Sequence, residues 1–147
     1  MEKFCLKWND FQTNVSKSFS TLRKEKEFYD VTLVTDDSHF LMAHKVVLSA
    51  SSDFLKSLLR KLDLAKPLIY LSGIGSKELG QIMEYIYEGK VKLFRDDIDT
   101  FLEVAKKLKI DGLDGNEEKR KDLIPNNFKK EEYDVNEHKR YHMTTGL

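Results

Sequence analysis

Two histidines near the end of the chain, His138 and His142, have the spacing of half a zinc site. They are followed by Met-Thr-Thr-Gly, and together this is the arrangement of the histidine half of a two-cysteine, two-histidine zinc finger. Such a finger needs two thiolates upstream to complete its tetrahedron, and no cysteine follows Cys5 in the sequence. We therefore predict no metal site. The pair is either the end of a degenerate finger or part of an unrelated tail.

The other residues of catalytic type lack the partners that catalysis needs. His39 and His44 lie in or beside strand-like segments with no nucleophile at a recognisable spacing. The serines of residues 49–52 have no nucleophile-elbow context, and Cys5 has no obvious activating neighbour. The Gly-Ile-Gly at residues 73–75 is too short to cradle a phosphate. We predict that the chain is not an enzyme and binds no cofactor.

Three acids close in sequence, Asp96, Asp97 and Asp99, suggest a cation site at first sight. They also open the last predicted helix, whose apolar positions run from Ile98 to Leu108. Acidic residues in a first helical turn are favoured by the helix dipole alone. Stabilisation of this helix start is therefore the preferred interpretation.

Asp30 and Lys45 are two charges in places where charge is unusual. Asp30 opens an otherwise apolar strand, and Lys45 stands at a helix start, where a cation opposes the macrodipole. Their signs are opposite, which makes them a candidate pair. Their separation in sequence does not place them in contact.

The segment around these charges predicts a strand pair followed by two helices. Residues 29–35 and 39–44 are strand-like and turn at Asp36-Asp37-Ser38, a cluster suited to a turn. Residues 43–59 then carry apolar residues at helical spacing, which predicts two buried helical turns separated by a cap at residues 51–53. The apolar positions are Val46, Val47, Ala50, Phe54, Leu55, Leu58, Leu59 and Leu62.

Three motifs in this region and before it resemble a known family. D-V-T-L at residues 30–33 and A-H-K-x-V-L-S-A-x-S at residues 43–52 resemble the BTB/POZ domain. FCLKWNDFQTNVSKSF at residues 4–19 is similar to the amino-terminal extension of the insect tramtrack group within that family. The resemblance implies an α+β fold in which a cluster of helices is flanked by a small sheet, with strands exchanged in a dimer.

Two short segments lack a local strand partner. Phe4, Leu6 and Trp8 alternate with other residues at the period of a strand, and so do Val91 and Leu93. Unpaired strand edges invite pairing between chains. The helix expected after the first segment places its apolar residues on one stripe, which either contacts a partner or packs on its own domain. The stripe residues are Phe11, Val15, Phe19 and Leu22.

The resemblance implies how these segments are used. In a BTB dimer the front strand of one chain joins residues 90–93 of the other, and Asp30 and Lys45 line a charged pocket near the dimer centre. The interface residues that we predict on this basis are Phe4, Leu6, Trp8, Phe11, Val15, Phe19, Val91 and Leu93.

Bulk composition limits the remaining possibilities. The 147 residues contain 25 Lys plus Arg and 25 Asp plus Glu, and a formal net charge of zero argues against direct nucleic-acid contact. One cysteine excludes an internal disulfide, and no apolar run approaches the roughly 20 residues of a membrane span. We predict one domain at residues 4–113, followed by a charged, polar, flexible tail at residues 114–147.

We expect a self-association module, a homodimer or larger, that recruits transcription or chromatin regulators. Its expected partners are itself, other BTB proteins and transcriptional co-regulators, with no membrane contact. The family resemblance places it in the nucleus, with the cytoplasm as the alternative. A substrate adaptor for a cullin-type ubiquitin ligase is the competing function, although the polar tail is poor in the apolar residues that a packed helical extension needs.

Overall fold

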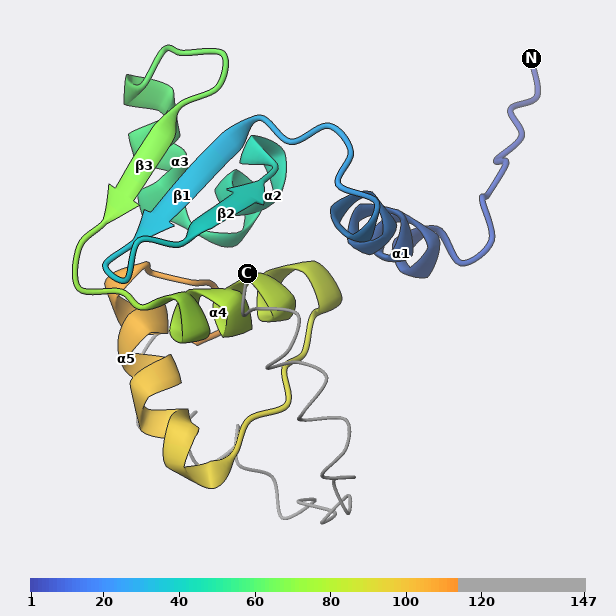
Figure 1. Cartoon of the computed structure of the whole chain (residues 1–147). Helices are drawn as coiled ribbons and strands as arrows, with labels where there is room; N and C mark the ends of the chain where they lie inside the picture. The colour runs from blue at the N-terminus through green and yellow to red at the C-terminus, as the bar shows by residue number, and fades with distance from the viewer. Residues whose placement is uncertain (114–147) are drawn as a thin grey trace. The chain divides into compact units, whose positions relative to one another are not determined.

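The structure, a computed structural model, describes residues 1–113, and the predicted tail at 114–147 lies outside the described residues. The described part contains a three-stranded sheet with strand order β2-β1-β3, which lies in front of α2 and α3 in Figure 1. β1 (Val31–Thr35) pairs antiparallel with β2 (Phe40–Ala43) and parallel with β3 (Leu68–Leu71). The predicted strand pair is thus confirmed, and a third short strand completes the sheet.

Helices make up most of the remaining described residues. They are α1 (Phe11–Lys24), α2 (Lys45–Ser51), α3 (Asp53–Lys61), α4 (Ser76–Glu88) and α5 (Ile98–Lys107), with a 3-10 turn at Arg95–Asp97 before α5. α4 ends at Gly89, whose φ of 76° is a left-handed conformation that glycine adopts without steric cost. Among the described residues, no helix combines the length and apolarity that crossing a membrane requires.

The core lies between the sheet and the helices. Val31, Leu33 and Ile69 point from the sheet into a cluster that includes Leu48 and Leu55 from α2 and α3. α4 and α5 add further buried apolar side chains, which are Leu79, Ile82, Met83, Phe101, Val104 and Ala105. The α+β class expected from the resemblance is confirmed, because a helical cluster does flank a small sheet.

One expectation about the core is wrong. Val46, Ala50 and Phe54 were expected to be buried, but all three are exposed, whereas Val47 and Leu48 of α2 are buried. A helix of this length that packs on one side buries only the side chains facing its neighbours. An apolar pair such as Val46-Val47 does not reveal which member faces inward.

The turn between β1 and β2 is joined to the β3–α4 connection by two carboxylates. Asp36 accepts hydrogen bonds from the Tyr70 hydroxyl at 2.7 Å and from the Gly73 backbone N–H at 2.6 Å. Asp37 accepts from the Thr35 hydroxyl at 2.5 Å and from both the N–H and the hydroxyl of Ser76. These bonds hold two loops together at one end of the sheet.

The same bonds predict a pH dependence of stability. The hydrogen bonds from Ser76 and Thr35 lower the pKa of Asp37 from 3.8 to about 2. A depressed folded-state pKa contributes stability above the unfolded pKa, and this is lost as the pH falls toward 2. Between roughly pH 2 and 4 the melting temperature of Asp37→Asn should therefore rise less steeply with pH than that of the wild type. Thermal melts across this range measure it, with Asp99→Asn as a control, and an unchanged slope contradicts the assignment.

The end of the domain folds back on the α2–α3 junction. Ser52 caps α3 by accepting a hydrogen bond from the Leu55 N–H at 3.1 Å, as the sequence predicted. Its hydroxyl also donates to the carbonyl of Leu108 at 2.5 Å, and Ser52 forms a β-bridge with Ile110. The Asp111 N–H donates to the Ser51 carbonyl at 2.9 Å, so residues after α5 are tied to the centre of the domain.

The two predicted exchange segments form no strand within one chain. Residues 1–8 contain neither helix nor strand, and residues 90–94 are likewise outside any strand. A strand is stable only when a neighbour satisfies its backbone hydrogen bonds, and the paired edges that these segments need are not adjacent to them in the sequence. Strand formation by exchange between two chains stays a prediction.

Candidate protein-interaction surface

The second half of α1 is attached to the end of α4. Ser20 is buried and its hydroxyl donates a hydrogen bond to the Glu88 carboxylate, while the Lys24 ammonium lies 3.7 Å from the same carboxylate. The guanidinium of Arg23 lies 5.3 Å from the centre of the Tyr87 ring, a cation–π distance. Phe19 packs against the core. This half of the helix therefore has a defined place on the domain.

A buried histidine secures the chain between α1 and the sheet. His44 is 4% exposed, and its Nε2 lies 2.6 Å from the carbonyl oxygen of Glu27. A carbonyl only accepts, so Nε2 carries the proton and Nδ1 accepts from the Tyr87 hydroxyl at 2.6 Å. Burial raises the pKa of Tyr87 to about 12, which keeps that hydroxyl protonated. The Tyr87 oxygen accepts in turn from the His44 backbone N–H at 3.0 Å.

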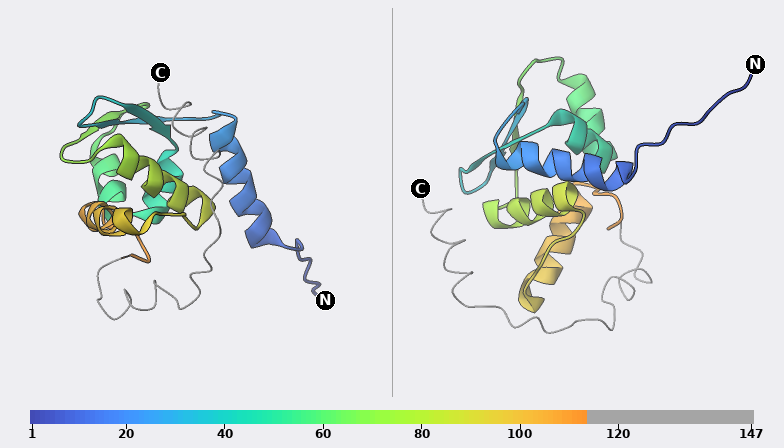
Figure 2. Two further views of the ribbon diagram at one scale, coloured as in Figure 1. Left: turned by 60° about the horizontal axis from the view of Figure 1, so that its bottom comes forward. Right: turned by 90° about the vertical axis from the view of Figure 1, so that its right-hand side faces the viewer.

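The first half of α1 and the segment before it lie apart from this attachment. Figure 2 shows the chain leading away from the domain toward its amino terminus. Phe4, Leu6, Trp8 and Phe11 are between 53% and 96% exposed, although the rings of Trp8 and Phe11 pack edge to face at 5.2 Å. Large apolar side chains gathered in this way are typical of a surface that another protein covers.

The apolar stripe of α1 is thus divided between two environments. Phe19 contacts the helix's own domain, Val15 is half-buried, and Phe11 is exposed. The alternative in which the stripe packs on its own domain is correct for Phe19 and not for Phe11. The structure therefore leaves the Phe11 end of the stripe free to meet a partner.

The other predicted interface residues, Val91 and Leu93, lie after α4. Both are half-buried and pack against the core, in a stretch that is neither helix nor strand. Within one chain, the described residues 1–8 and 90–93 do not pair as strands. Their pairing between two chains stays a prediction.

Asp30 and Lys45 do lie next to each other, but their side chains do not form an ion pair among the described residues. The Asp30 carboxylate accepts a hydrogen bond at 2.7 Å from the backbone N–H of Lys45, the first residue of α2. The Lys45 ammonium donates instead to the Leu64 carbonyl at 2.7 Å. Asp30 therefore acts as the cap of α2, which has no cap from His44, the residue before it.

This geometry predicts the effects of changing Asp30. Asp30→Ala should lower the free energy of unfolding by about 1 kcal/mol, the usual cost of losing a helix cap. Asp30→Asn keeps an oxygen that can accept the Lys45 N–H, so its cost should be clearly smaller. Chemical denaturation of the two variants measures the difference. Equal losses would show that the charge of Asp30, rather than the hydrogen bond, stabilises the domain.

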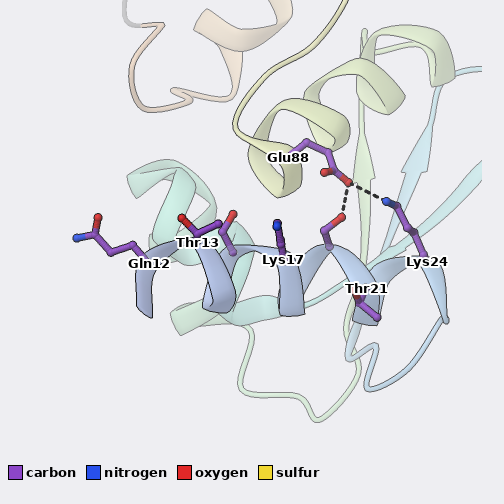
Figure 3. A pocket seen from close by; sticks show the side chains of 8 residues that line it. Gln12, Thr13, Lys17, Thr21, Lys24 and Glu88 are labelled. Carbon is purple, nitrogen blue, oxygen red and sulfur yellow. Dashed lines mark hydrogen bonds and ion pairs between the residues drawn. The ribbon is translucent and has the colours of Figure 1, made fainter. Parts of the chain in front are cut away.

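A shallow hollow of about 670 Å³ runs along one side of α1 (Figure 3). It is lined by hydroxyl, amide and lysine side chains of α1 together with Glu88. These groups already bond one another at Ser20, Lys24 and Glu88. No histidine or cysteine lines it, and within residues 1–113 no group of three or more potential metal ligands is found.

The structure adds apolar residues that the sequence analysis did not assign to an interface. Val46, Ala50 and Phe54 are exposed on α2 and at the start of α3. Their spacing of four residues was visible in the sequence, but it was attributed to burial. Exposed apolar side chains on α2 enlarge the surface available to a partner beyond α1.

An α+β domain whose first helix exposes large apolar side chains has the features of a protein-interaction module. The comparison with protein families gives the particular family. Residues 19–121 match the BTB/POZ domain, and the chain belongs to this family. The resemblance stated from the motifs at residues 30–33 and 43–52 is confirmed.

Curated relatives from Drosophila melanogaster agree with the tramtrack group. The chain is 43% identical over 112 residues to Longitudinals lacking protein-like, covering 76% of this chain and 87% of that relative. It is 35% identical to the Broad-complex core protein and 38% identical to Protein abrupt, again over 76% of this chain. The chain spans only 15% and 12% of those two relatives.

A solved structure shows the same fold. The structure of the BTB domain of human gigaxonin superimposes on this chain with a TM-score of 0.65. The superposition covers 77% of this chain and 92% of the gigaxonin chain. Sequence identity is 23%, so the likeness concerns the fold.

Proposed function

We propose that this chain associates with itself through α1 and the segment before it, and that it recruits transcription or chromatin regulators in the nucleus. The exposure of Trp8 and Phe11 carries the proposal. The Phe11 ring at the start of α1 and the Trp8 ring just before it contact each other, and together they form an apolar projection next to a helix whose other end is attached to the domain. Covering such a projection is favourable by roughly 25 cal/mol per Å² of buried apolar area.

The amino-terminal segment and residues 90–93 are proposed to pair between two chains. Phe4 and Leu6 have the alternation of a strand and are almost fully exposed, whereas Val91 and Leu93 are held against the core. An exposed segment from one chain would then meet a segment from the other that is held against its own core. Pairing of this kind satisfies backbone groups and adds the apolar side chains to a common sheet. In this dimer Asp30 and Lys45 would line the charged pocket.

The regulatory role rests on family membership. Self-association modules bring together whatever is attached to them, and the chain matches a small fraction of Broad-complex core protein and Protein abrupt. We propose that this domain supplies association, while contact with nucleic acid, where it is needed, belongs to other segments or partner proteins. The balance of 25 basic and 25 acidic residues supports this division.

Light scattering coupled to size exclusion tests self-association. The full chain should give at least a dimer of the 17.2 kDa protomer at micromolar concentration. Phe11→Glu places a charge on the exposed ring position and should shift the particle to a smaller species. Gln12→Glu adds the same charge at the next position of α1 and should leave the mass unchanged. A wild-type chain that runs as a 17.2 kDa monomer at micromolar concentration would contradict the proposal.

The competing function, adaptor of a cullin-type ligase, has a separate test. A pull-down with a purified cullin scaffold should not retain the full chain. The likeness to gigaxonin concerns the fold and does not favour this function. Stable capture of the wild type, lost in Phe54→Glu but not in Gln12→Glu, would replace the regulator proposal with the adaptor function.

A further inference from the structure

The sheet has a second face, opposite the core, that is apolar and exposed. The register pairs Val34 with Phe40 and with Tyr70, and Thr32 with Met42 and with Leu68. Residues paired in register project to the same side of a sheet, so these six form two parallel rows on one face. Phe40, Met42, Leu68 and Tyr70 are 50% to 66% exposed. We call the six residues the outer sheet face.

Nothing in the described part of the chain covers the outer sheet face. In Figure 1 the sheet lies in front of α2 and α3, and no described helix or strand crosses it on the viewer's side. None of the six residues is charged. A sheet face exposed to water normally carries polar side chains, because polar and apolar residues alternate along each strand. A contiguous apolar face of this kind marks a contact site on a soluble domain.

The charges at the two ends of this face are of opposite sign. Asp36 and Asp37 follow β1 at one end, and the hydrogen bonds that Asp37 accepts lower its pKa to about 2, which keeps it ionised. Lys45 follows β2, and Lys66 precedes β3, at the other end. Asp30 is also at this end, but its carboxylate is occupied by the α2 backbone. The face therefore runs from an acidic end to a basic one.

This polarity identifies the partner. A second copy stacked on this face, related to the first by a two-fold axis that lies in the contact plane at right angles to the strands, would place its acidic end over the basic end of the first. The same residues would then meet on both sides, which is the definition of an isologous contact. A partner of uniform charge, or a nucleic acid, would be repelled at one of the two ends.

We propose that the outer sheet face binds the outer sheet face of a second copy of this chain. Two sheets that stack face to face lie about 10 Å apart, with side chains of the two faces interdigitated. Aromatic and methionine side chains suit this packing because their large apolar area is buried at little cost in conformational freedom for the rings. The contact uses no residue of α1, so it goes beyond the self-association proposed above and joins dimers into larger particles.

The test uses the full chain and light scattering over a range of protein concentrations. Met42→Lys with Leu68→Lys places four like charges in the contact and should reduce the wild-type particle to the α1-mediated dimer. Ser57→Lys with Glu103→Gln changes the net charge equally at exposed positions on α3 and α5, and should leave the mass unchanged. Thermal melts establish that both double variants are folded.

A second variant avoids changing the sheet. Lys66→Glu lies before β3 and makes both ends of the face acidic, so the concentration at which large particles dissociate should rise about tenfold. The effect should shrink in high salt, because exposed charges are screened. Lys106→Glu, at an exposed position on α5, makes the same change in net charge and serves as the control.

Phe11→Glu separates this proposal from the previous one. If both hold, the Phe11 variant keeps a dimer made through the sheet, and combining it with the two lysines gives a 17.2 kDa monomer. If Met42→Lys with Leu68→Lys dissociates the dimer and Phe11→Glu does not, the sheet contact stands and the α1 contact fails. An unchanged mass in the Met42 and Leu68 variant, or a wild type that Phe11→Glu alone converts to monomer, overturns the sheet contact.

Discussion

Replacing His44 by alanine is expected to lower the free energy of unfolding by about 3–5 kcal/mol. The His44 side chain is 4% exposed, and it hydrogen-bonds the Glu27 carbonyl and the Tyr87 hydroxyl. No other side chain in the described part of the chain is shown to bond these two groups. Loss of the His44 side chain leaves the Glu27 carbonyl without its donor and the Tyr87 hydroxyl without its acceptor. Tyr87 is buried, and an unsatisfied buried group costs about 1–3 kcal/mol, while the vacated space between Tyr29 and Tyr87 adds a packing loss.

His39→Ala provides the matched control for this experiment. His39 is an exposed histidine on the β1–β2 turn, and its removal should change stability by no more than about 0.5 kcal/mol. Urea denaturation of both variants gives the comparison. Because the Glu27 bond holds the connection after α1, His44→Ala should also increase amide exchange near the end of that helix. A loss below about 1 kcal/mol would contradict the assigned hydrogen bonds.

Ser52→Ala is expected to cost about 2–4 kcal/mol, which is large for the removal of one oxygen atom. The hydroxyl accepts from the Leu55 N–H as the cap of α3 and donates to the Leu108 carbonyl beyond α5. A lost cap costs about 0.5–2 kcal/mol, and a buried carbonyl without a donor costs about 1–3 kcal/mol. Both groups lie where water has no access, since Ser52 has no exposed surface.

Ser57→Ala is the control for the Ser52 variant. Ser57 lies on the exposed side of α3, where alanine has the higher helix propensity, so this change should be neutral or slightly stabilising. Calorimetric melts of the two variants measure the difference. If Ser52→Ala and Ser57→Ala have equal melting temperatures, the bond across to Leu108 does not hold the end of the domain in place.

Local sequence was sufficient wherever neighbouring residues decide the conformation. The cap at Ser52 follows from a side chain that bonds a backbone N–H three residues away, and the turn at Asp36-Asp37 from residue types that favour turns, with Thr35 and Asp37 bonded side chain to side chain. The stripe on α1 follows from helical spacing alone. The motifs at residues 30–33 and 43–52 identified the family, and the family match over residues 19–121 confirmed it.

The candidate site was only partly accessible in this way. Asp30 and Lys45 were recognised as a pair because each is out of place in its own element, and they do lie together. The atoms that bond were not predictable, because the strand must first be placed against the start of α2. His44 was recognised as part of a motif, yet its partners Glu27 and Tyr87 come from 17 and 43 residues away in the chain.

Tertiary structure alone decided which apolar residues are covered. Val46 and Val47 are neighbours of one type, and only the packing of α2 distinguishes them. In β2 and β3 apolar side chains occupy both faces, so alternation cannot say which face is the core. The hydrophobic effect rewards removal of any apolar surface from water and has no direction of its own. Residue types therefore determine how much surface must be buried, and the arrangement of the elements determines what is left for a second chain.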